Sequence, residues 1–492
     1  MVKKITDSDI CAVSESIILR KLNSFAKIAI IFQSANILYA KSIAFRCFIY
    51  TFADRYIIYN DIRFMITDAE RSAITALIRS QVVPAIGCTE PVSVALCVSR
   101  ASALMGRVPD SIELSLSLNI LKNAMGVGIP GTGMVGLPIA VALGAIVGRH
   151  ELGLEVLRDT DAVAVEKARR YVGEGRIKIA LEEHDTDKLF IRVLCRSGED
   201  ETEAIIKGHH TDFVYLRKNC DVLLEKQAGT VSEESICVPL TLRKVYEYAT
   251  TTCTDDIKFI LEAKHLNENA AHSGLTENYG HALGKTLCSP LGRGIMGDGI
   301  FSRILSVTSC ACDARMAGAM VPVMSNSGSG NQGICATMPV VVFAEENHNT
   351  EEELIRALVL SNLTAIYIKQ ALGALSALCG CVVASTGSSC GITYLMGGTY
   401  EQVAFSVKNM IANLTGMICD GAKPSCALKL TTGVGTAVMS AMLAIQNKHV
   451  TSVEGIIDDD VDRSIHNLTD IGSKGMSETD RFVMNIMTNK TK

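Results

Sequence analysis

Tryptophan is absent from this 492-residue sequence, and aromatic residues make up only 5% of it. Aromatic side chains provide the stacking surfaces on which proteins bind bases, so a nucleic-acid-binding role is disfavoured. The net charge of −5 also gives no basic surface that would attract nucleic acid or an anionic membrane. We therefore expect neither nucleic acid nor a membrane as partner.

The sequence also lacks a recognisable cleavable secretion signal, although it contains 17 cysteines. Disulfide frameworks are typical of small secreted proteins, whereas this chain is long and its cysteine count is odd. We expect reduced thiols in a cytoplasmic protein, most of them buried as small hydrophobic residues. A few can be ligands of a metal or cluster.

Charge is missing from two stretches, 316–344 and 370–400, each long enough to cross a bilayer. Both contain many Gly, Ser, Thr and Asn residues, whose polar groups a lipid-facing helix would have to satisfy internally. Tightly packed helices and buried glycine loops explain this composition better. A membrane transporter is kept as an alternative.

Hydrophobic periodicity predicts an α+β fold. Residues 66–104 are predicted to be helical with a break over 83–91, and from about Ser232 helices alternate with glycine-rich loops. Between these parts, strands are predicted over 111–118, 177–181, 189–194 and 203–206, with helices over 137–147 and 161–171. We expect a mostly helical domain formed by 65–105 with 229–492, and an inserted α+β sandwich domain over 106–228.

Three cysteine segments can carry chemistry. Cys419 and Cys426 flank a turn-forming Asp-Gly and a proline, so that one loop can direct both thiols toward one centre, as iron–sulfur ligation requires. Cys379 and Cys381 flank Gly380 and would face different ways, so only one of them is expected to point inward. Cys88 lies on a turn between two prolines, which suits a thiolate base or ligand. Packing as small core residues is the alternative for every one of these cysteines.

Two glycine-rich loops, 119–133 and 325–333, match neither a dinucleotide-binding fingerprint nor a phosphate loop. Such loops at helix starts present backbone N–H groups to anions, and a substrate carboxylate is the expected anion. Tight helix packing is the alternative. His209 and His210 show no metal-binding spacing and are expected to be surface or loop residues.

Four motifs in this order resemble the L-cysteine desulfidase family, which is related to the alpha chain of iron–sulfur L-serine dehydratases. They are Gly-Cys-Thr-Glu-Pro at 87–91, Asn-Ala-Met-Gly-Val-Gly-Ile-Pro-Gly-Thr-Gly at 123–133, Ser-Asn-Ser-Gly-Ser-Gly-Asn-Gln-Gly at 325–333 and Cys-Asp-Gly-Ala-Lys at 419–423. The likeness extends from Met65 to about Asn489.

The resemblance implies a [4Fe–4S] cluster held by three cysteines, with one iron left open. The family's ligands match Cys419 and Cys426, and the third falls at Cys381 in preference to Cys379, because a Gly-Cys pair occupies this place in the serine dehydratases. Cys88 matches the proton acceptor of the desulfidases. The implied reaction is β-elimination of L-cysteine to pyruvate, ammonia and sulfide.

The substrate-binding candidates have in common a polar side chain in or beside the glycine loops: Ser325, Asn326, Asn331, Lys122 and Lys423. L-serine dehydratase activity is the nearest alternative function, because one buried side chain can set the preference between substrates. A cluster-bearing sensor without turnover and a pyridoxal-phosphate lyase are weaker alternatives, the latter because no Schiff-base lysine context is apparent. A homodimer is expected from base rates and from the apolar composition.

The first 64 residues contain no glycine or proline and match nothing in the family, whereas all 39 glycines lie in the rest of the chain. The sequence changes character at Met65, and Thr67-Asp68-Ala69-Glu70 follows, a pattern typical of a helix start. We expect residues 1–64 to be an atypical extension, either not native or disordered; a targeting peptide is the alternative, which five acidic residues weaken. Mass spectrometry of the N-terminus from the native source tests this, and finding Met1 or Val2 there would contradict it.

Overall fold

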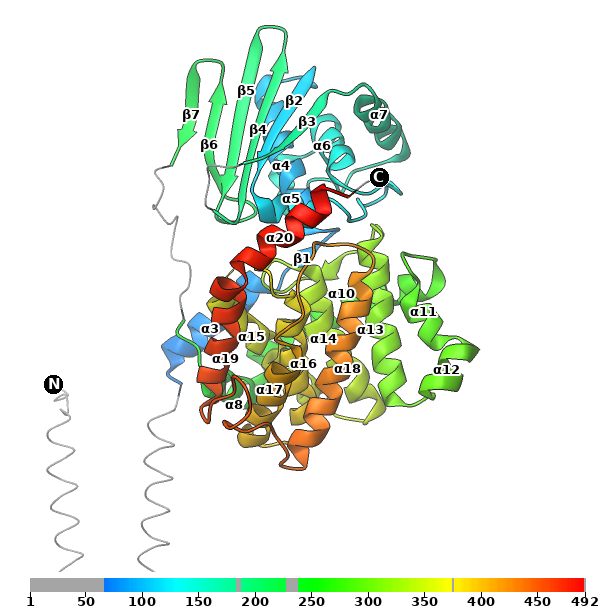
Figure 1. Cartoon of the computed structure of the whole chain (residues 1–492), viewed down its shortest axis with the longest axis vertical. Helices are drawn as coiled ribbons and strands as arrows, with labels where there is room; N and C mark the ends of the chain where they lie inside the picture. The colour runs from blue at the N-terminus through cyan, green and yellow to red at the C-terminus, as the bar shows by residue number, and fades with distance from the viewer. Residues whose placement is uncertain (1–65, 183–186, 227–237, 374–375, 491–492) are drawn as a thin grey trace, which may run out of the picture. The chain divides into compact units, whose positions relative to one another are not determined.

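A computed structural model describes residues 66–182, 187–226, 238–373 and 376–490 of the chain. The predicted extension over residues 1–64 lies outside the described residues. The described part contains a six-stranded sheet and a large group of helices, which confirms the predicted α+β class (Figure 1). The arrangement of an inserted domain over 106–228 stays a prediction.

The sheet has the strand order β3-β2-β4-β5-β6-β7, in which β2 and β3 are parallel and all other neighbours are antiparallel. Its strands are β2 (Ser111–Leu116), β3 (Ile177–Leu181), β4 (Phe190–Ser197), β5 (Asp200–Lys207), β6 (Phe213–Lys218) and β7 (Asp221–Glu225). The alternation predicted for β2 is present, because Ile112, Leu114 and Leu116 are buried while the residues between them are partly exposed.

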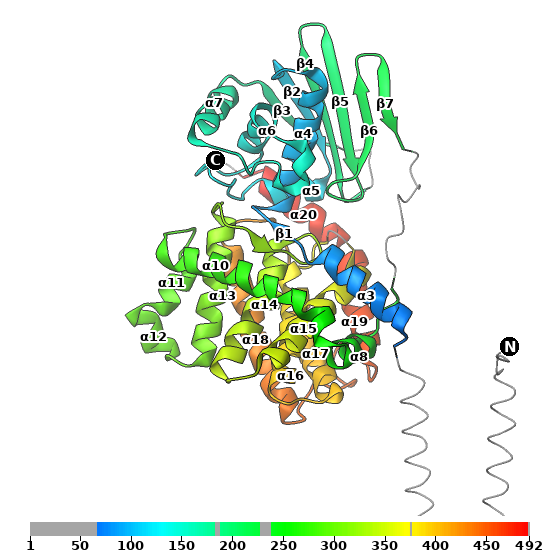
Figure 2. The ribbon, with the colours of Figure 1, turned by 180° about the vertical axis from the view of Figure 1, so that it is seen from behind.

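Helix α4 packs against β4 and β5 on one face of this sheet, α6 packs against α4, and α7 packs against α6 (Figures 1 and 2). The helical segments in this part are α4 (Thr89–Met105), α5 (Leu118–Ala124), α6 (Leu137–Ile146), α7 (Ala162–Gly173) and the 3-10 turn η1 (His150–Glu155). Helices α4 and α6 approach closely, since a side chain at Gly144 would place its Cβ 2.5 Å from the carbonyl oxygen of Ala95. Apolar residues of the helices and strands form one hydrophobic core.

Strands β6 and β7 were not anticipated from the sequence. Periodicity identifies a strand by its buried face, and β7 lies at the sheet edge with nearly all its residues exposed. In β6 only Leu216 is buried. The turn between the two strands is marked by Asn219 in the left-handed conformation, with φ of 52°.

The remaining elements lie outside this sheet core, and most of them contribute residues to a second hydrophobic core. They are α3 (Asp68–Gln81), β1 (Pro84–Ala85), α8 (Leu242–Thr251), α9 (Thr254–Ile257), η2 (Lys258–Ile260), α10 (Leu261–Thr276), α11 (Leu283–Cys288), α12 (Pro290–Met296), α13 (Ile300–Met316), β8 (Val323–Met324), α14 (Gly330–Glu346), α15 (Glu351–Leu372), α16 (Gly380–Leu395), α17 (Tyr400–Leu414), α18 (Cys426–Ile445), α19 (Val461–Asp470), η3 (Ile471–Gly475) and α20 (Ser477–Thr488).

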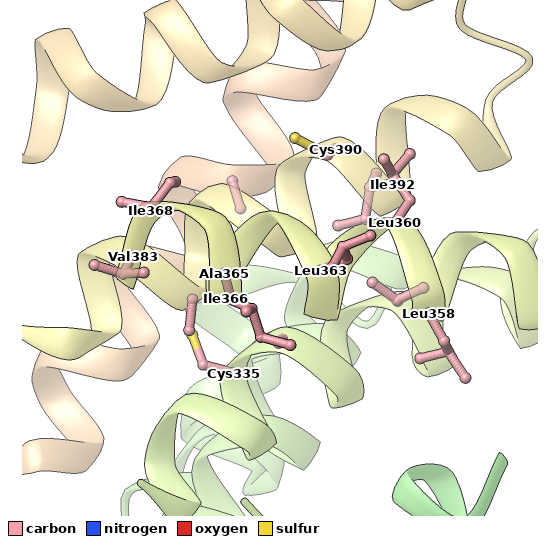
Figure 3. Packing of buried hydrophobic residues seen from close by; sticks show 14 of the residues in the cluster. Cys335, Leu358, Leu360, Leu363, Ala365, Ile366, Ile368, Val383, Cys390 and Ile392 are labelled. Atoms are coloured by element: carbon pink, nitrogen blue, oxygen red, sulfur yellow. The ribbon is translucent and has the colours of Figure 1, made fainter. Parts of the chain in front are cut away.

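Small residues allow the helices of this second core to pack closely. A Cβ at Gly387 of α16 would lie 2.2 Å from the carbonyl oxygen of Ser361 in α15, so the backbones meet there without an intervening side chain. Figure 3 shows Cys335 and Cys390 among the aliphatic side chains around these helices. Both thiols are buried, as expected for cysteines acting as small hydrophobic residues.

The two uncharged stretches do not form continuous long helices. Residues 316–344 are divided among α13, β8 and α14, and residues 370–400 among α15, α16 and α17. The buried hydroxyls of α16 are satisfied within that helix; Thr386 Oγ1, for example, donates to the carbonyl oxygen of Val382 at 2.8 Å. Within the described residues, α18 is the one helix long and apolar enough to cross a membrane, and 56% of its apolar window is buried.

Helix α20 is fastened to α5 by a buried ion pair. Lys122, only 1% exposed, donates through Nζ to Asp480 Oδ1, and Asn119 Nδ2 donates to Asp480 Oδ2 at 3.0 Å. Both groups are removed from water, so each depends on the other to offset its desolvation. The contact joins the C-terminal helix to a segment of the sheet core.

We predict that Asp480→Asn destabilises the protein by about 3–5 kcal/mol, because it leaves the Lys122 ammonium buried without a counter-charge. Replacing both partners, as in Lys122→Met with Asp480→Leu, should cost much less. Glu478→Gln on the same helix is the control, because Glu478 forms an exposed pair with Arg481 that contributes at most about 1 kcal/mol. Urea unfolding measures all three; equal losses for Asp480→Asn and Glu478→Gln would contradict the prediction.

Candidate active site

One pocket brings the cysteine motifs together. Five cysteines from three separate segments contribute to its wall, namely Cys88, Cys379, Cys381, Cys419 and Cys426. Its other lining residues are Glu90, Asn123, His210, Arg315, Ser327, Gly328, Ser329, Asn331, Gln332, Lys369, Ser376, Leu378, Gly380, Gly421 and Ala422. Segments more than 300 residues apart in the sequence therefore meet at one place.

Four helices begin at this pocket. Cys88, Ser329, Cys379 and Ser425 are the N-cap residues of α4, α14, α16 and α18, and none of these four side chains caps its helix. The first N–H groups of α4, α14 and α16 therefore keep their donor capacity, whereas those of Cys426 and Ala427 in α18 donate to the carbonyls of Lys423 and Pro424. The helix dipoles of all four add partial positive charge. Helices α14, α16 and α18 lie side by side, so that their starts are neighbours (Figure 1). Such an arrangement stabilises thiolates and carboxylates.

Backbone pairing aligns the two segments that carry the predicted ligands. Leu378 and Ile418 form an antiparallel bridge. The N–H of Cys379 donates to the carbonyl of Met417 at 2.9 Å, and the N–H of Cys419 donates to the carbonyl of Ala377 at 2.6 Å. This pairing accounts for the approach of Cys379 and Cys381 to Cys419, which sequence spacing could not specify.

The loop from Cys419 to Cys426 depends on Gly421. Its φ of 87° is in the left-handed region, and a Cβ there would lie 2.3 Å from the carbonyl oxygen of Lys122. The Cys426 thiol contacts the carbonyl oxygen of Gly421 at 3.7 Å. Glycine is therefore required both by backbone conformation and by the close approach of α5.

The pocket thiols differ in acidity. A hydrogen bond from Cys381 lowers the pKa of Cys379 to about 7 and raises the pKa of Cys381. Burial raises the pKa of Cys419, and it raises the pKa of Cys426 to about 11. Cys381, Cys419 and Cys426 are therefore protonated at neutral pH in this arrangement, and binding of a metal would displace their protons.

These thiols fit a cluster in type and in placement, because they share one pocket with the starts of α16 and α18. In the described part of the chain, no three His, Cys, Asp or Glu side chains already lie close enough to hold a metal ion. Ligation would therefore require the thiols to turn toward a common centre.

Cys88 belongs to a short hydrogen-bonded chain. Its thiol donates to Glu90 Oε2 at 3.2 Å, and Asn123 Nδ2 donates to Glu90 Oε1 at 3.0 Å. Burial, and then the charge of Glu90, raises the pKa of Cys88. The thiol is thus held protonated beside a carboxylate that can accept its proton.

Several polar residues of the pocket belong to no sequence motif. Arg315 and Lys369 lie in the long helices α13 and α15, where no motif distinguishes them from other charged residues. Burial lowers the pKa of Lys369 to about 8. His210 lies in the loop between β5 and β6 as expected, but it is not a surface residue, because its Nε2 is buried and lines the pocket. Its position depends on a long-range contact, the hydrogen bond from Ser93 Oγ to its carbonyl at 2.5 Å.

Four buried side-chain atoms of the lining have no partner among the described residues: His210 Nε2, Arg315 Nε, Gln332 Oε1 and Asn123 Oδ1. Buried polar groups are nearly always hydrogen-bonded in folded proteins. Their concentration in one pocket indicates a site for a polar ligand that both donates and accepts hydrogen bonds.

Most of the predicted binding residues lie elsewhere. Asn331 lines the pocket, but Ser325 Oγ donates to the carbonyl of Val83 at 2.6 Å and thereby supports the pairing of β1 with β8. Asn326 Nδ2 donates to Asn362 Oδ1 at 3.0 Å within the helical core.

Neither predicted lysine lines the pocket. Lys122 is paired with Asp480, and Lys423 Nζ lies 2.6 Å from Asp420 Oδ1 within the cysteine loop. The loop that follows Lys122 is used for packing: a Cβ at Gly128 would lie 2.3 Å from the carbonyl carbon of Ala317.

Fold and pocket together describe an α+β protein with a thiol-rich site for a small polar ligand. The family model described as serine dehydratase alpha chain matches residues 151–485. A UPF0597 protein of Bacteroides fragilis is 64% identical over 425 residues, which cover 86% of this chain and 99% of that protein. UPF0597 proteins of Porphyromonas gingivalis and Oleidesulfovibrio alaskensis are 53% and 44% identical over 426 and 416 residues, covering 85% and 84% of this chain and 98% and 97% of their own.

The chain therefore belongs to the serine dehydratase alpha-chain family. The resemblance to the L-cysteine desulfidase family is confirmed, because the UPF0597 proteins are that family. Family membership indicates a lyase.

We predict that Gly421→Ala lowers the free energy of unfolding by at least about 1–2 kcal/mol, because alanine is strained in the left-handed conformation. The clash with the Lys122 carbonyl should also loosen the loop and speed alkylation of Cys419 and Cys426 by iodoacetamide. Gly416→Ala is the control, since nothing lies within 4 Å of a Cβ at that position. Denaturant unfolding and peptide mapping measure both effects, and indistinguishable variants would contradict the prediction.

Proposed function

We propose that this protein catalyses iron–sulfur-dependent β-elimination on a small amino acid, with L-cysteine converted to pyruvate, ammonia and sulfide. The observation that carries the proposal is the pocket that Cys381, Cys419 and Cys426 line together with Cys88, at the starts of four helices that lack side-chain caps. Family membership supports the reaction class.

Cys381, Cys419 and Cys426 would hold a [4Fe–4S] cluster, which when bound supplies an open iron as a Lewis acid. The helix starts favour the thiolate form of these ligands. Nearby cations also favour the thiolate form. Lys429 Nζ donates to the carbonyl of Ile418 at 2.8 Å, beside Cys419, and Lys369 lines the pocket.

Cys88 is the proton acceptor in this proposal. Its thiol donates to Glu90, so the carboxylate is placed to accept the thiol proton, and the start of α4 together with the charge of Arg315 would favour the thiolate that remains. That thiolate removes the Cα proton as the carbon–sulfur bond at Cβ breaks and sulfide leaves. The resulting aminoacrylate is hydrolysed to pyruvate and ammonia. Asn123 holds Glu90 in place throughout.

L-serine dehydratase activity is the second candidate, and the match to the serine dehydratase alpha chain favours it. The same residues would expel water from Cβ in place of sulfide. The transporter alternative finds no support in the described residues, because the two uncharged stretches are divided among shorter, largely buried elements. The sensor alternative leaves the Cys88–Glu90 pair without a role.

We also infer a cytoplasmic homodimer. Free thiols in all described cysteines support a reducing compartment. Helix α18 exposes Met439, Met442 and Leu443 on its outer face, an apolar surface of the kind that subunit contacts cover.

Anaerobic purification followed by iron and sulfide quantitation, absorption spectroscopy and pyruvate assays tests the function. We expect about four irons per chain. Sulfide release and pyruvate from L-cysteine should accompany them, with L-serine assayed in parallel. Pyruvate from L-serine alone would establish the second candidate, and the absence of both cluster and turnover after reconstitution would refute the proposal.

Serine variants in the same experiment assign the cysteines. Cys381→Ser should lose most of the iron. Cys379→Ser should retain it, although only Gly380 separates the two cysteines. Cys88→Ser should retain the cluster and its spectrum but lose turnover by about 100-fold or more, the usual size of a general-base contribution. Cys390→Ser, buried in α16 away from the pocket, is the control for replacing a buried thiol. Iron retained in Cys381→Ser but lost in Cys379→Ser would reverse the ligand assignment.

A further inference from the structure

We propose that Arg315, together with the start of α14, binds the carboxylate of the substrate. This inference rests on the proposed function, because it identifies the part of the pocket that recognises an α-amino acid. Nothing in the sequence motifs includes Arg315, which is the penultimate residue of α13.

Arg315 is a buried cation without a counter-ion. The residue is 3% exposed, and no carboxylate among the described residues forms an ion pair with it. Its guanidinium donates from Nη1 to Asn331 Oδ1 at 2.9 Å and contacts Met316 Sδ at 3.3 Å, while its Nε has no partner. A buried charge is normally paired, because its desolvation is otherwise not offset. The missing partner is therefore an anionic ligand in the pocket that Arg315 lines.

The start of α14 provides a second, independent donor set. The helix has 17 residues and begins at Gly330 without a side-chain cap, so its first N–H groups have no partner within the helix. Ser329, Asn331 and Gln332 from this start line the same pocket. A guanidinium beside a helix N-terminus suits a planar carboxylate, which accepts two parallel hydrogen bonds.

Two neighbours hold the guanidinium in position. Asn331 accepts from Arg315 through Oδ1, which also accepts from the Cys312 thiol at 3.6 Å, so Asn331 is a positioning residue. Gly330 leaves the space that the guanidinium occupies, because a Cβ there would lie 2.2 Å from Arg315 Nε. Residue 330 must therefore lack a side chain for the Arg315 guanidinium to occupy this position.

The rest of the pocket favours an amino acid over a simple anion. Glu90 also lines it and offers a carboxyl oxygen as a hydrogen-bond acceptor, which it keeps after accepting the Cys88 proton. A ligand with one carboxylate and one ammonium group therefore finds a partner for each end. Asn123 Oδ1, which has no other partner among the described residues, adds an acceptor for the ammonium group.

The test compares L-alanine with L-alaninamide, which has a neutral amide in place of the carboxylate. Neither compound has a leaving group at Cβ, so neither can react. Calorimetry on anaerobically reconstituted protein should show that the wild type binds L-alanine at least about tenfold more tightly, as expected for charge-assisted hydrogen bonds. Arg315→Gln should abolish this preference. Arg303→Gln on the same helix should keep it, because Arg303 is half-exposed and paired with Glu346.

Gly330→Ala provides a second variant that retains the charge. Its Cβ should displace the guanidinium and reduce the preference for L-alanine, even if Arg315→Gln fails to fold. Equal affinity of the wild type for the acid and the amide, binding of neither, or an unchanged preference in a folded Arg315→Gln protein would overturn the proposal. A wild type that prefers L-alanine but eliminates nothing from L-cysteine or L-serine would refute the proposed function and leave the carboxylate site standing.

Discussion

The convergence of four uncapped helix starts on one pocket is the constraint on which the other features of this site depend. An isolated helix start is satisfied by a side-chain cap or by water, but here Cys88, Ser329, Cys379 and Ser425 provide no side-chain cap. The resulting partial positive charge favours anions, and the buried Arg315 and Lys369 increase it. The protein alone does not pair all hydrogen-bonding groups of this region. Among the described residues, several buried polar atoms of the pocket lining have no hydrogen-bond partner.

Bringing helix starts together requires backbones to approach one another, and glycine makes this possible at each junction. Gly421 allows the cysteine loop to rest on the Lys122 carbonyl, and Gly330 admits the Arg315 guanidinium. At Gly380, a Cβ would lie 3.1 Å from the amide carbon of Gln332, so α16 and α14 also meet closely at the pocket. The glycine-rich loops are consequently elements of packing as much as of ligand binding.

Charge pairing at a distance from the pocket supports the same geometry. Lys122 contacts the cysteine loop through its carbonyl and α20 through its ammonium group, so one residue connects α5, the loop and the C-terminal helix. Its ammonium group forms an ion pair with Asp480. A lysine beside a glycine loop is thus compatible with a structural role, and its charge alone does not identify a substrate contact.

The sequence by itself determined the α+β class, strands β2 to β5, helices α3, α4, α6 and α7, the helical character of the chain from about residue 232 and the motifs whose cysteines line the pocket, because periodicity and local turn chemistry are properties of neighbouring residues. Tertiary structure decided which polar side chains accompany those cysteines. Ser325 and Asn326 stand in a motif, yet their hydrogen bonds go to Val83 and Asn362, while Arg315 and His210 reach the pocket without any motif. The physical reason is that the direction of a side chain depends on long-range contacts, such as the Leu378–Ile418 bridge, which no local pattern encodes.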